Sequence, residues 1–183
     1  DGFVVYESAD TRSARCFPGS VMLWPSKKAS KRTRNAIAYY LLRKYAPESE
    51  LYPSCLKLRT RIDQLLAVVS NEIHPKQQVF LRPRFWDKTK PSKEEVAAYE
   101  RDVLGGMEHL IGESKFALGD KLTLADLCLV SNLAIALENG SVDRAKFPKL
   151  VSYYERMKVE LAYFDEIYRS SITNLQQRWA ELN

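Results

Sequence analysis

The 183-residue sequence predicts a mainly α fold, a helical bundle preceded by one strand and one helix. Apolar residues recur every three or four positions over residues 58–73 and again over residues 96–111, which is the spacing of amphipathic helices. Helix-start signals precede several of these segments. Near the beginning of the chain, residues 3–6 are β-prone and predict one short strand.

A long interruption follows this strand. Residues 9–34 contain Pro18-Gly19, Pro25 and several serines without any period, which predicts a loop or disorder, and helical spacing begins only after Asn35. If the interruption is removed, Ser8 joins Asn35 and the strand runs directly into a helix that Ser8 can cap. The N–H groups at such a helix start can hold a carboxylate.

The positive charge of the chain is concentrated in this interruption. Residues 9–34 carry seven basic residues and one acidic residue, a net charge of +6, whereas the whole chain has a net charge of +5. The remaining residues therefore have a net charge of −1. Since a basic run of this kind is typical of a solvated loop, we expect no nucleic-acid partner.

Two explanations account for the basic insertion over residues 9–34. In the first, it is a surface loop whose ends stay close together, because the entropy cost of closing a loop rises slowly with length. In the second, it is untranslated sequence such as a retained intron. Its abrupt ends, biased charge and lack of periodicity favour the second explanation.

The rest of the chain predicts an all-helical domain over residues 55–183. We expect its first long helix, over residues 58–73, to end or kink at Pro75. A later helix is expected after Thr123, whose side chain can cap it while Asp126 reaches back to the Thr123 N–H. These two residues are therefore predicted to form a structural cap.

The composition argues against several kinds of site. The three cysteines are far apart and odd in number, which argues against a disulfide framework and suits a reducing cytoplasm. The two histidines form no ligand pattern, so no metal is expected. No run approaches the roughly 18 apolar residues of a membrane span, so we expect no membrane partner.

Four separated segments carry a recognisable pattern. Residues 7–8 joined to 35–41 read E-S-N-A-I-A-Y-Y-L, residues 51–53 read L-Y-P, residues 116–127 read F-A-L-G-D-K-L-T-L-A-D-L, and residues 146–150 read K-F-P-K-L. In this order the segments resemble cytosolic glutathione transferases, most closely the arthropod delta and epsilon classes. The resemblance extends nearly end to end from the first helix to the last residue.

The resemblance divides the chain into parts. A thioredoxin-like α/β domain is represented by its last strand within residues 1–8 and its last helix over residues 35–45, with the basic insertion between them. A linker over residues 46–54 leads to the C-terminal helical bundle over residues 55–183. We therefore expect a fragment of this family, truncated at its N-terminus and carrying an insertion after Ser8.

The resemblance implies a cytoplasmic, homodimeric detoxification enzyme that transfers glutathione to small hydrophobic electrophiles. In this family a Ser or Tyr hydroxyl near the start of the thioredoxin-like domain stabilises the glutathione thiolate. No residue of this sequence matches that hydroxyl, and Tyr6 lies in the last strand of the domain. We assign no catalytic residue and expect this chain to lack the activating hydroxyl.

The resemblance also implies two sets of binding residues. Ser8 would bind the γ-glutamyl carboxylate of glutathione through its hydroxyl and N–H, and Glu7 would accept a hydrogen bond from the γ-glutamyl amine. The family often has an Arg after this Ser, whereas Asn35 follows here. The electrophile site is expected to be lined by four residues around the end of the first long helix and by one near the C-terminus, namely His74, Gln77, Gln78, Leu81 and Tyr168.

Two non-catalytic functions are alternatives. The same fold serves as an assembly domain in the gamma subunit of translation elongation factor 1, and residues 35–40 fit that group equally well. A ligand-holding protein would use the apolar pocket without chemistry. Retention on a glutathione column together with turnover would distinguish the enzyme from both alternatives.

Overall fold

The computed structural model describes residues 34–182 of the chain. Within this range the regular structure is helical and no strand is present. The predicted mainly α fold class is therefore confirmed for the part of the chain that the structure describes. The predicted strand at residues 3–6, the two glutathione contacts Glu7 and Ser8, and almost all of the basic insertion lie outside the described residues.

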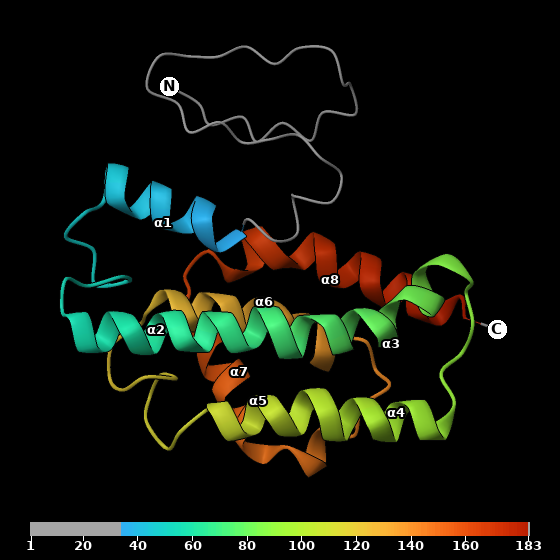
Figure 1. Cartoon of the computed structure of the whole chain (residues 1–183). Helices are drawn as coiled ribbons and strands as arrows, with labels where there is room; N and C mark the ends of the chain where they lie inside the picture. Colours follow the sequence, from blue (N-terminus) through green and yellow to red (C-terminus); the bar gives the residue numbers. More distant parts are fainter. Residues whose placement is uncertain (1–33, 183) are drawn as a thin grey trace, which may run out of the picture.

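The described chain is a succession of α-helices, with two π turns and one 3-10 turn among them (Figure 1). In chain order, the segments are α1 (Arg34–Tyr45), α2 (Leu56–Val68), η1 (Val69–Ile73), α3 (His74–Trp86), α4 (Lys93–Tyr99), η2 (Glu100–Leu104), α5 (Gly105–Leu110), α6 (Leu124–Glu138), η3 (Arg144–Lys146), α7 (Pro148–Glu160) and α8 (Phe164–Ala180).

One long helical rod runs from α2 through the π turn η1 into α3 (Figure 1). Pro75, expected to end or kink a helix, lies in the first turn of α3, directly after η1. Proline has no N–H, so one helical hydrogen bond is missing at this point of the rod. The π turn thus resets the hydrogen-bond register just before the proline, and the chain stays helical.

Helix α6 lies at the centre of the bundle and packs against α2, α7 and α8. Nine of its fifteen residues are buried, so the helix is covered on more than one face instead of presenting a single apolar stripe. The backbone carbonyl of Asn132 accepts a hydrogen bond from the buried Gln77 side chain of α3 at 3.1 Å. The position of α6 therefore restricts the positions of the surrounding helices.

A buried carboxylate, Asp126, fixes the start of α6. Its side chain is fully buried and accepts hydrogen bonds from the Thr123 N–H at 2.8 Å and the Thr123 hydroxyl at 3.0 Å. It also accepts from the Ala117 N–H at 2.8 Å and from the Tyr153 hydroxyl at 2.7 Å. One side chain thus caps α6 and ties it both to the preceding turn and to α7.

Helix α1 has no fully buried residue, but its half-buried Tyr39 and Leu42 pack against the core, and polar contacts add to this attachment. The Tyr39 hydroxyl of α1 donates to Asp63 of α2 at 2.6 Å. The hydroxyl of Tyr52, in the connection between the two helices, donates to the same carboxylate at 2.9 and 3.0 Å. Burial, and then the Asp63 carboxylate, raise the pKa of Tyr39, so this hydroxyl keeps its proton and remains a donor.

A buried arginine connects α3 to α4. The Arg84 side chain is 1% exposed, and its two terminal nitrogens donate to the two oxygens of Glu95 at 3.1 and 2.5 Å. Glu95 also accepts from the Ser92 N–H at 2.9 Å and so helps to cap α4. The Arg84 hydrogen bond lowers the pKa of the Glu95 carboxyl below its usual value, with the Ser92 N–H as the next cause.

Replacing Asp126 by alanine is expected to lower the free energy of unfolding by about 3 kcal/mol or more, because two N–H groups and two hydroxyls lose their acceptor. Urea denaturation followed by circular dichroism measures this loss. Asp120→Ala is the matched control, since Asp120 is an exposed residue of the preceding turn. An equal, small loss in both variants would contradict the prediction.

Glu95→Gln is expected to lower the free energy of unfolding at pH 7 by about 1–3 kcal/mol, because Arg84 stays buried while half of the Glu95 side chain is solvent-screened. A depressed folded-state pKa means that the contribution of Glu95 is present above its unfolded pKa and is lost as the pH falls through the lower folded pKa. The wild type and the variant should therefore converge in urea titrations at progressively lower pH. Glu48→Gln, at an exposed position outside α4, is the control for charge alone.

Candidate functional site

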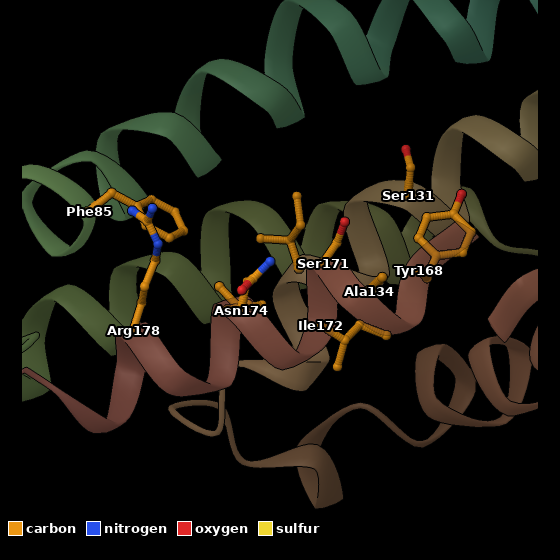
Figure 2. A pocket seen from close by; sticks show the side chains of 10 residues that line it. Phe85, Ser131, Ala134, Tyr168, Ser171, Ile172, Asn174 and Arg178 are labelled. Carbon is orange, nitrogen blue, oxygen red and sulfur yellow. The ribbon is translucent and has the colours of Figure 1, made fainter. Parts of the chain in front are cut away.

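A cavity of about 460 Å³ lies between α3, α6 and α8, and we refer to it as the apolar cavity. Its size is within the range of small-molecule sites, and its walls are mainly hydrocarbon with a few polar groups. Figure 2 shows these walls from close by. The lining residues are Phe85 from α3; Ser131, Ala134 and Ile135 from α6; and Tyr168, Ser171, Ile172, Asn174, Leu175 and Arg178 from α8.

Helix α8 supplies more than half of this lining. Its contributing residues recur at intervals of three and four, so they share one face of the helix. In Figure 2 the Arg178 side chain reaches from α8 toward Phe85 of α3, and Asn174, Ser171 and Tyr168 follow along the helix. The cavity therefore has an aromatic and cationic end at Arg178 and a phenolic end at Tyr168.

Tyr168 provides a hydrogen-bond donor inside the cavity. Burial, followed by the nearby Tyr163 and Cys128, raises the pKa of its hydroxyl above the usual value. The group consequently keeps its proton at neutral pH and can donate to an acceptor atom on a ligand. Its ring packs against Phe164 at a centroid distance of 4.8 Å, which restricts the direction of the hydroxyl.

The α6 wall is less reactive than its residue types imply. The Ser131 hydroxyl donates to the Cys128 carbonyl at 2.8 Å, so its proton is already engaged within the helix. Burial raises the pKa of the Cys128 thiol, which keeps it in the unreactive thiol form. This side of the cavity therefore offers shape and apolar surface for binding, with no activated nucleophile.

The structure separates the five residues predicted for the electrophile site. Tyr168 lines the apolar cavity, whereas His74, Gln77, Gln78 and Leu81 do not. Gln77 is 1% exposed, and its amide nitrogen donates to the Tyr99 hydroxyl at 3.2 Å and to Asn132. Leu81 is part of the core, and His74 and Gln78 are half-buried. In this arrangement Gln77 has no N–H left for a ligand.

Phe85, the α6 residues and the α8 residues other than Tyr168 line the cavity but were not among the predicted site residues. The helical spacing of Tyr168, Ile172 and Leu175 indicates that they share one apolar face of the last helix. The interspersed Ser171 and Asn174 interrupt the apolar stripe, and sequence spacing alone does not reveal which helix faces which. Bringing α3 and α8 together is a property of the folded bundle.

Metal sites and membrane-spanning helices were also considered for residues 34–182. No cluster of three or more His, Cys, Asp or Glu side chains in this part of the chain is arranged to hold a metal ion. None of the helices described there is both long and apolar enough to cross a membrane.

Comparison with known proteins gives one family. The sequence profile of the glutathione S-transferase C-terminal domain matches residues 36–158. A delta-class glutathione transferase of Nilaparvata lugens superposes with a TM-score of 0.71 at 20% identity, over 81% of this chain and 69% of that one. An epsilon-class enzyme of the housefly, Musca domestica, gives 0.70 at 23% identity, over 81% and 68% of the two chains.

A third similar structure contains a ligand. It is a glutathione transferase homologue of Drosophila mojavensis with bound glutathione, which superposes with a TM-score of 0.65 at 25% identity over 81% of this chain and 66% of that one. These three similar structures are insect proteins, one of the delta class and one of the epsilon class, and they share the helical bundle described above.

Proposed function

The chain belongs to the glutathione S-transferase family, and from this premise we propose that it binds glutathione and takes a small hydrophobic electrophile into the apolar cavity. The observation that carries the proposal is the cavity itself, about 460 Å³ of mainly hydrocarbon surface with a phenol at one end. Apolar surface of this kind binds hydrophobic groups by removing them from water.

The chemistry proposed is thiol conjugation. The glutathione thiolate attacks an electrophilic carbon and forms a carbon–sulfur bond, and the leaving group departs with its bonding electron pair, as chloride does from a chloroarene. The Tyr168 hydroxyl would donate a hydrogen bond to a polar atom of the electrophile, since it stays protonated. The apolar walls would orient the electrophile's body.

Glutathione itself is proposed to bind through Glu7 and Ser8, as the sequence pattern implies. The similar structure from Drosophila mojavensis, which contains glutathione, supports glutathione as the co-substrate. Location in the cytoplasm, homodimer formation and a role in detoxification are further parts of this proposal, supported by family membership. Which electrophile is processed depends on the cavity's own shape.

Binding and turnover are separate parts of the proposal, because no residue of the sequence is assigned as the hydroxyl that activates the thiol. A protein that retains glutathione and conjugates 1-chloro-2,4-dinitrobenzene is an enzyme of the family. A protein that does neither fits the assembly-module alternative, and one that binds apolar ligands without any dependence on thiol fits the ligand-holding alternative.

The apolar cavity predicts how a glutathione thioether will bind. S-hexylglutathione should bind on the order of 100-fold more tightly than glutathione in isothermal titration calorimetry, because each buried CH₂ contributes roughly 0.8 kcal/mol. Ser171→Trp should remove this gain by filling the cavity while leaving the affinity for glutathione unchanged. Ser170→Trp, at an adjacent exposed position outside the cavity, is the matched control. Equal losses in the two variants would contradict this placement.

The glutathione contact predicts a different pattern. Ser8→Ala should lower the affinities for glutathione and for S-hexylglutathione by the same factor, about tenfold, because a hydrogen bond to the charged carboxylate is lost. Ser13→Ala, a matched change within the insertion, should have no effect. Unchanged elution of the Ser8 variant from a glutathione column would remove Ser8 from the site.

A further inference from the structure

A second, polar cavity adjoins the apolar one. It measures about 370 Å³ and lies between the ends of α3 and α8. Phe85, Asn174 and Arg178 line both cavities, so the two lie next to each other along α8. A ligand in the apolar cavity therefore lies close to the groups that line the polar one.

The polar cavity is lined by three cations, two of which have a carboxylate partner. Arg84 pairs with Glu95 and Lys88 with Glu181, whereas Arg178 has no such pair among the described residues. Lys88 and Glu181 form an ion pair at 3.2 Å, but both side chains are more than 60% exposed, and such pairs are weak. No carboxylate of the described residues lies within ion-pair distance of Arg178, whose guanidinium stands 5.5 Å from the centre of the Phe85 ring. Arg178 is thus an exposed cation without a carboxylate partner, and it lines both cavities.

Arg84 adds a second observation on the same wall. Its terminal nitrogens are occupied by Glu95, whereas its Nε–H is buried and has no hydrogen-bond partner among residues 34–182. A buried donor without a partner is costly in free energy, so this arginine is held in place at a cost. The buried arginine is also held rigidly, which maintains its charge beside the cavity.

The end of α3 brings Lys88 to the same rim. Lys88 has a φ of 53°, in the left-handed region that ends helices and that residues other than glycine adopt uncommonly. The following Thr89 N–H donates back to the Pro83 carbonyl at 3.4 Å. The chain turns sharply at this point, and the lysine reaches Glu181 just beyond α8.

We propose that the natural ligand of the adjoining cavities is an amphipathic carboxylic acid, with its hydrocarbon body in the apolar cavity and its carboxylate at Arg178. A planar guanidinium can donate two parallel hydrogen bonds to a carboxylate, and the nearby Lys88 is held only by a weak, exposed ion pair. The side-chain amides of Asn174 and Gln177, which also line the polar cavity, supply further donors. This inference rests on the apolar cavity of the proposed function and specifies the ligand class that enters it.

The test compares an acid with its uncharged analogue on the full chain. Isothermal titration calorimetry at pH 7.5 uses decanoate and decan-1-ol, which share a ten-carbon chain and differ in the head group. Decanoate should bind at least tenfold more tightly than decan-1-ol. Arg178→Gln should weaken decanoate at least tenfold and leave decan-1-ol within twofold. Raising the salt concentration should weaken decanoate alone.

The matched control is Arg82→Gln, which removes an exposed arginine of α3 that lines neither cavity and should change neither affinity. Lys88→Gln serves as a second variant, with a smaller loss for decanoate expected. Equal affinity for the two ligands, no binding of decanoate, or equal effects of Arg178→Gln and Arg82→Gln would each overturn the proposal.

The outcomes separate this inference from the proposed function. If S-hexylglutathione gains nothing over glutathione but decanoate binds with dependence on Arg178, the anionic site stands and the conjugation proposal fails. If S-hexylglutathione gains affinity that Ser171→Trp removes, while decanoate shows no dependence on Arg178, the apolar cavity stands and the carboxylate site is wrong.

Discussion

The described structure depends on the carboxylate of Asp126. This one buried group accepts four hydrogen bonds, from the turn before α6, from the start of α6 and from Tyr153 of α7. Because α6 is buried on several faces, a fixed start to this helix also fixes Ser131, Ala134 and Ile135, which form one wall of the apolar cavity. This wall of the cavity is thus positioned by a structural cap about two turns away.

Helix α8 turns this fixed wall into two adjoining environments. Its apolar side chains face α6, whereas its last turns bring Arg178 against Phe85 and beside the polar cavity. Burial of apolar surface contributes affinity but does not orient a ligand, whereas hydrogen bonds from a planar guanidinium do orient it. Their succession along a single helix face explains why the same surface supports both a hydrophobic electrophile and an amphipathic acid as proposed ligands.

Local sequence patterns predicted the local features well. The Thr123 and Asp126 spacing pointed to a cap, and helical periodicity identified the bundle, because both depend on contacts between residues three or four positions apart. The π turn before Pro75 was not predicted, since a change in hydrogen-bond register leaves no clear mark in helical periodicity. The hydrogen bonds of Gln77 could not be predicted from local patterns either, because its partners Tyr99 and Asn132 are distant in the sequence.

The sequence by itself determined the helical fold class, the family and the concentration of positive charge in the insertion, since each is written in composition, spacing or a short motif. Only the tertiary structure decided which side chains share a cavity. Phe85 and Arg178 are far apart along the chain, and their contact arises because α3 and α8 both pack around the same bundle. Periodicity predicts which face of a helix is apolar. Which element covers that face depends on the packing of the whole domain.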